Sequence, residues 1–199
     1  EELAQIFKQY SSISWSQINL DSSSVQAIQM TLGLVKFTEA IIKFHKGNKA
    51  INIEIAIAGN NIVSSIFTNE IFPEQWAACQ MDLGVAYRHR VCGERSLNLE
   101  QAIQFYHNAL LIFTPESHLG MWAYTLNNLA IALSERIQGN RAENLEQAIA
   151  YCQQVLRICD RNIFPEQWGK MKMNLGTFYK ERVCGDKIEN LELSIRSYN

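Results

Sequence analysis

The pentapeptide Phe-Pro-Glu-Gln-Trp at residues 72–76 recurs letter for letter at residues 164–168, which lie 92 residues further along the chain. Trp122 stands halfway, 46 residues from the tryptophan that ends each pentapeptide. The same step of 46 residues relates four glycines, which are Gly47, Gly93, Gly139 and Gly185. Identity at a fixed period, without insertion or deletion, is typical of repeat architectures in which each repeat is one supersecondary unit. The sequence therefore predicts a repeat array.

The register of this period divides most of the chain into four units. In order, these units are 25–70, 71–116, 117–162 and 163–199, of which the first is divergent and the last is truncated inside its second helix. Residues 1–24 fall outside the register, and their apolar spacing predicts a short helix followed by a linker. Solenoids need a polar terminal cap, so self-association through the uncapped last unit is a further expectation.

Each unit is predicted to form two antiparallel helices, which makes the class all-α. The first helix begins at Pro73 or Pro165, because proline is favoured at the first helical position. It is predicted to end at the repeated glycine, which accepts the left-handed conformation of a helix C-terminus. The second helix is predicted to begin at Asn98 and its equivalents, because an asparagine side chain can accept a hydrogen bond from an otherwise unpaired backbone N–H.

Small residues at fixed places relate these units to a known family. Leu-Gly-x-x-Tyr at residues 83–87, Ala-x-x-x-Tyr at 102–106 and then Ala109 resemble the tetratricopeptide repeat, with Gly84 small where two helices approach closely. The amino-acid sequence of residues 139–149 is similar to the repeat sequences of the long tetratricopeptide arrays of filamentous cyanobacteria and related bacteria. Such arrays commonly precede a caspase-like peptidase domain of the CHAT type or accompany signalling ATPases. The resemblance implies a right-handed α-solenoid that acts as a scaffold or sensor module.

Composition excludes several classes of protein. Hydrophobic residues make up 47% of the 199 residues and charged residues 19%, which is a globular balance. The net charge of −2 disfavours nucleic acid as a partner. The apolar stretch at 51–58 is far too short to cross a membrane. Five cysteines without a close pair predict buried thiols in a reducing, cytoplasmic compartment and no metal site.

The sequence carries no motif of catalysis or cofactor binding. It lacks a nucleophile elbow, a phosphate-binding glycine loop and a dinucleotide fingerprint, so we expect neither an enzyme nor a cofactor. The histidines share no repeat position, and the repeated tryptophans Trp76, Trp122 and Trp168 are predicted to be core anchors. One alternative stays open. The array could be the regulatory or substrate-presenting arm of a larger enzyme, a CHAT-type peptidase or an ATPase, with its catalytic domain outside this chain.

Arginines also recur with the period, one turn before the repeated glycine, as Arg90, Arg136 and Arg182. A cation at this place is favourable at the negative end of a helix dipole. We interpret the row as structural, with an ion pair to one of the repeated glutamates Glu100, Glu146 or Glu192.

A candidate binding face follows from the helical wheel of the first helices. The face opposite Trp76, Leu83 and Tyr87 corresponds to the concave groove that takes peptides or helices in tetratricopeptide arrays. The predicted protein-binding residues are Val35, Met81, Val85, Arg88, His89, Tyr124, Asn127, Ile131, Met173 and Thr177. The cationic residues that grip a C-terminal carboxylate in related arrays are absent from the middle of this row, so we expect an apolar peptide or helix as the partner.

Overall fold

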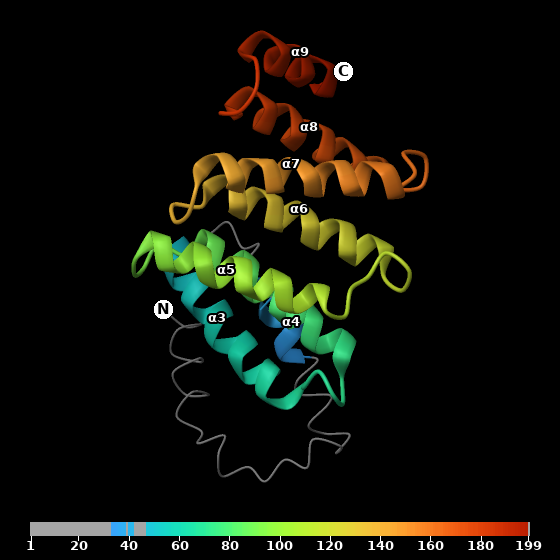
Figure 1. Ribbon diagram of the computed structural model, residues 1–199. Coiled ribbons are helices and arrows are strands. Elements are labelled where there is room, and N and C mark those ends of the chain that lie inside the picture. Colours follow the sequence, from blue (N-terminus) through green and yellow to red (C-terminus); the bar gives the residue numbers. More distant parts are fainter. Residues whose placement is uncertain (1–32, 39, 42–46, 199) are drawn as a thin grey trace.

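The computed structural model describes residues 33–38, 40–41 and 47–198 (Figure 1). Helices succeed one another along this part of the chain as α3 (Lys49–Ile66), α4 (Pro73–His89), α5 (Arg95–Leu110), α6 (Leu119–Glu135), α7 (Arg141–Ile158), α8 (Pro165–Glu181) and α9 (Lys187–Tyr198). Residues 33–38 and 40–41 are helical too, and no strand occurs within the described ranges. The predicted all-α class is therefore confirmed. The predicted helix and linker in residues 1–24 lie outside the described residues, and the division into four units stays a prediction.

The helices repeat with the period of the sequence. The first helices α4, α6 and α8 begin at residues 73, 119 and 165, and the second helices α5, α7 and α9 begin at 95, 141 and 187. Each helix packs against the next one in the chain, so the array extends in one direction from α3 to α9 (Figure 1). Proline stands at the start of α4 and of α8, as predicted. None of the helices found between residues 33 and 198 is both long enough and apolar enough to span a membrane.

The start of the second helix differs from the prediction. Helix α5 begins at Arg95, three residues before Asn98, and the capping side chain of α7 is Asn140 rather than Asn144. Asn98 is buried inside the helix, where its Nδ2 donates to the carbonyl oxygen of Cys92 over 2.9 Å. The equivalent asparagines in α7 and α9 bond the preceding turn in the same way. This asparagine therefore holds the turn between the two helices and does not cap the helix.

The repeated glycines lie in that turn. Their φ angles are +89° at Gly47, +79° at Gly93, +77° at Gly139 and +81° at Gly185, which confirms the left-handed conformation. Helix α4, however, already ends at His89, four residues before Gly93. The prediction that glycine ends the first helix was wrong. The glycine reverses the chain just before the second helix begins.

We expect Gly139→Val to lower the free energy of unfolding by about 1 kcal/mol or more, because a β-branched residue resists positive φ. A Cβ at this position would meet no atom closer than 3.7 Å, so the cost comes from backbone strain alone. Gly139→Asn is expected to cost clearly less, since asparagine tolerates the left-handed region. Chemical denaturation of the two variants checks this difference, and equal losses would contradict it.

One continuous hydrophobic core runs from α4 to α8. Trp122 is 5% exposed within it, whereas Trp76 and Trp168 are only half-buried. The Trp168 ring lies under the cations of Arg161 and Lys172, at 5.0 and 5.5 Å from the ring centroid. The prediction of three core anchors holds for Trp122 and fails for Trp168, which lies outside the main core cluster, whereas Trp76 packs against that cluster but is only half-buried.

The cysteine thiols, like the tryptophans, differ in burial. Cys79, Cys152 and Cys159 are buried, as predicted, and burial raises the pKa of Cys152 to about 12. Cys92 and Cys184 are exposed, contrary to the prediction, because both lie in the turns that precede second helices.

Candidate protein-binding surface

The first helices lie closer to one another than the second helices do. Helix α4 contacts α6, and α6 contacts α8, whereas no comparable contact joins α5 to α7 or α7 to α9. An array whose first helices approach each other bends toward them. Helices α4, α6 and α8 therefore line the inner surface, and the sequence-predicted row lies on these helices and on the helical residues 33–38.

The predicted row is not uniformly open. Met81 is 8% exposed and belongs to the main core, so its prediction as a protein-binding residue on an open face was wrong. Val85 and Ile131 are half-buried and pack against the same core. Val35 is half-buried against a separate cluster around Phe67. The helical wheel places residues on a face, but it does not include the side chains of the neighbouring unit that cover part of it.

Exposed side chains of the row come from α6 and α8. Tyr124 and Met173 are 38% and 64% exposed, and Thr177 is exposed as well. Asn127 is half-buried, and its Oδ1 accepts a hydrogen bond of 2.7 Å from Nδ2 of Asn174. This bond connects α6 to α8 across the inner surface. The open part of the predicted row therefore combines one aromatic and one thioether side chain with amide and hydroxyl groups.

Arg88 and His89 lie at the other end of the row, where the two Nη atoms of Arg88 have partners and its buried Nε has none. Arg88 Nη1 donates to Glu135 Oε1 over 3.1 Å, which joins α4 to α6. Arg88 Nη2 lies 2.9 Å from Nε2 of His89. Burial, reinforced by the charges of Arg88, Lys49 and Arg95, lowers the pKa of His89 to about 4. His89 is therefore neutral at pH 7, and its Nε2 can accept a hydrogen bond from Arg88 Nη2.

A repeated ion pair joins each first helix to the preceding second helix. Arg136 donates through Nε and Nη2 to the two carboxylate oxygens of Glu100, each over 2.7 Å. Arg90 makes the same pair with Glu54, and Arg182 makes it with Glu146. The hydrogen bond to glutamate raises the pKa of each arginine. The predicted ion pair is confirmed for Glu100 and Glu146, and it always crosses from one unit to the next.

A second ion pair lies beside this Arg-Glu pair at two contacts between neighbouring units, α5 with α6 and α7 with α8. Glu135, next to Arg136, accepts from Arg95 Nη2 over 2.6 Å, and Glu181, next to Arg182, accepts from Arg141 Nη2 over 2.6 Å. Adjacent Glu and Arg residues at the end of α6 and of α8 thus face an Arg and a Glu near the start of α5 and of α7. We call this arrangement the double ion pair. Sequence spacing showed the arginine row, but only the folded array showed the second pair.

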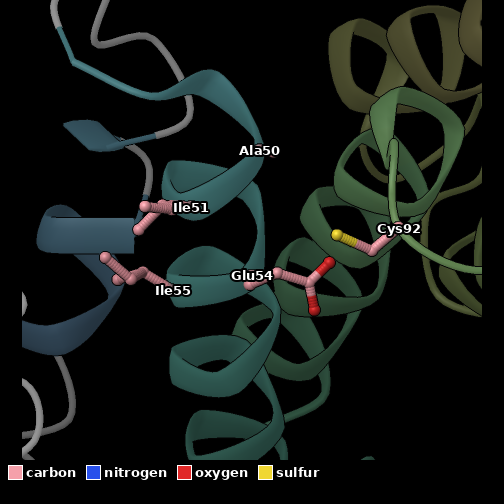
Figure 2. A pocket seen from close by; sticks show the side chains of 5 residues that line it. All are labelled: Ala50, Ile51, Glu54, Ile55 and Cys92. Atoms are coloured by element: carbon pink, nitrogen blue, oxygen red, sulfur yellow. The ribbon is translucent and has the colours of Figure 1, made fainter.

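A cavity of about 320 Å³ opens beside α3 (Figure 2). It is lined by Ala50, Ile51, Glu54, Ile55 and Cys92. Glu54 is the one charged residue among these five, and both of its carboxylate oxygens accept hydrogen bonds from Arg90. The cavity therefore holds an apolar surface and a thiol, without a free acid or base. Within the described ranges, no three residues of the His, Cys, Asp or Glu types are grouped so that they could hold a metal ion.

Comparison with known proteins gives one match. A family model of the tetratricopeptide repeat matches residues 122–158, which span most of α6, the following turn and all of α7. No curated protein and no solved structure matches the chain. The match supports a tetratricopeptide repeat protein, in agreement with the helix pairs and with the small residues at their crossings.

Proposed function

We propose that the chain is a protein-interaction module that binds a peptide or helix along the inner surface of α4, α6 and α8. One observation carries this proposal: Tyr124 and Met173 are exposed on the two first helices that an inter-helix hydrogen bond holds together. Grooves between helices commonly receive the apolar face of a partner. Tetratricopeptide repeats serve mainly in such interactions, so the chain itself acts by binding and not by catalysis.

The chemistry of the surface favours an apolar partner. Methionine re-packs around different shapes, and tyrosine offers a large apolar ring with a polar end. Arg88 already faces Glu135, so its charge is not free for a terminal carboxylate. The partner side chains are therefore apolar where they meet Tyr124 and Met173, with polar contacts at Asn127 and Thr177.

We expect Tyr124→Ala combined with Met173→Glu to weaken binding of peptides selected from a displayed random library by about tenfold or more, because exposed aromatic and thioether anchors carry most of the contact energy. Fluorescence anisotropy with one labelled selected peptide measures the dissociation constant. The melting temperature should hardly change, since both side chains are exposed.

The matched control is Leu111→Glu, which places a charge on a side chain that is 69% exposed in the turn after α5, away from the predicted row. It should leave peptide binding unchanged. Selected peptides that bind the double variant as tightly as the unchanged chain would overturn the assignment of the inner surface.

The sequence resemblance supports a second role as the arm of a larger enzyme. In that role the array presents a substrate to a CHAT-type peptidase domain, or it regulates a signalling ATPase. The bacterial arrays whose repeat sequences it resembles are found beside such domains. The free, exposed thiols of Cys92 and Cys184 support a reducing compartment such as the cytoplasm. The complete open reading frame tests this role directly, because a peptidase or ATPase domain would be encoded beside the array.

A further inference from the structure

Helix α9 exposes a row of large apolar side chains. Ile188, Leu191, Ile195 and Tyr198 recur at the spacing of one helix face, and they are 70%, 43%, 61% and 52% exposed. In α7, the positions equivalent to Leu191 and Ile195 are Leu145 and Ile149, which are 0% and 4% exposed. Helix α8 packs against α7, and both helices contribute to the main core. The face of α9 thus repeats a surface that a first helix covers elsewhere in the array.

The charges of α9 repeat the same pattern. Lys187 and Glu192 occupy the positions of Arg141 and Glu146, which form the double ion pair with the Glu-Arg end of α8. Glu192 has an ion pair with Arg196 in its own helix, at 3.5 Å. Within residues 47–198, Lys187 has no carboxylate partner and Glu192 has no partner from another helix. The apolar row of α9 is therefore flanked by a cation without a carboxylate partner and by an anion whose one printed partner, Arg196, belongs to the same helix.

We propose that this face of α9 is a docking surface for an amphipathic partner helix that ends in adjacent Glu and Arg residues. The partner's glutamate pairs with Lys187, its arginine pairs with Glu192, and its apolar face covers Leu191 and Ile195. This helix has the chemistry of α6 and α8, which dock in this way on α5 and α7. Charge complementarity at fixed positions, repeated at two junctions of the array, identifies the partner's chemistry.

Among the described residues, a second copy of the chain offers no first helix with an unpaired Glu-Arg end. The Glu-Arg ends of α6 and α8 are already paired inside each copy. In α4, His89 and Arg90 occupy these positions, and Arg90 is paired with Glu54. The residues that carry the proposal are Lys187, Leu191, Glu192 and Ile195 of α9, and none of them belongs to the predicted row on α4, α6 and α8.

A labelled peptide with the sequence of residues 165–183, which is α8 with its Glu-Arg end, tests the proposal against the whole chain by fluorescence anisotropy. We expect saturable binding that Ile195→Glu weakens by about tenfold or more and that Glu192→Arg weakens by about five- to tenfold. A peptide carrying Arg182→Glu should bind the unchanged chain weakly and should regain affinity for the Glu192→Arg variant. Leu111→Glu is the control and should leave the affinity unchanged.

Three results would overturn the proposal. The first is that the peptide shows no saturable binding, and the second is that Glu192→Arg behaves like Leu111→Glu. The third is that the chain forms dimers in sedimentation equilibrium that Ile195→Glu dissociates, because a second copy would then cover the face. The substituted side chains are exposed, so unchanged melting temperatures confirm that each variant is folded.

Discussion

Replacing Trp122 by alanine is expected to lower the free energy of unfolding by about 3–5 kcal/mol, the usual cost of truncating a large aromatic residue in a core. Trp122 is 5% exposed and belongs to the cluster that extends from α4 to α8. Its removal would leave a cavity that helices on both sides cannot fill. Urea denaturation measures the loss.

The repeat itself provides the matched control for this prediction. Trp168 has the same place in its unit, yet it is half-buried and lies against two cations instead of inside the core. Trp168→Ala should therefore cost clearly less, about 1–2 kcal/mol, through lost surface burial and cation–π contact. Equal losses at the two positions would show that the repeat position, and not the tertiary environment, decides the role of this tryptophan.

Gly84→Ala is expected to lower the free energy of unfolding by about 2 kcal/mol. A Cβ at Gly84 would lie 2.5 Å from Cε1 of Tyr106, a ring that is 0% exposed and cannot move aside. Overpacking of this kind costs about 1–3 kcal/mol, against which alanine gains up to about 1 kcal/mol in helix propensity. Thermal and chemical denaturation measure the balance, and a neutral or stabilised variant would contradict the close packing of α4 on α5.

Alanine substitutions at two other glycines test whether the loss of stability at Gly84 comes from close packing. Gly176 is the equivalent position in α8, where a Cβ would lie 2.8 Å from the ring of Tyr198, which is 52% exposed. That ring can move, so Gly176→Ala should be less damaging than Gly84→Ala. No atom lies within 4 Å of a Cβ at Gly169 inside α8, so Gly169→Ala should stabilise the chain by about 0.5–1 kcal/mol.

Local chemistry and periodicity were sufficient to predict the helix pairs. A period of 46 residues, proline at the start of first helices and glycine at positive φ are properties of the chain itself, and each is found in the described residues. Small residues at helix crossings were predictable for the same reason, since Gly84 directly faces Tyr106. The start of the second helix was not predictable in this way. Asn98 has a good capping side chain, but the folded turn engages it with the carbonyl oxygen of Cys92.

Tertiary structure alone decided which of several equivalent residues are buried, paired or open. Met81 was predicted on an open face but lies in the core, and Leu191 is exposed where its equivalent Leu145 is buried. Glu100 pairs with Arg136 of the next unit and not with Arg90 of its own, because the end of each first helix faces the preceding second helix. In a repeat array, equivalent side chains have a similar local sequence context in successive units. Its burial and its charge partners depend on the neighbouring units, and the units at the ends of the array have fewer neighbours.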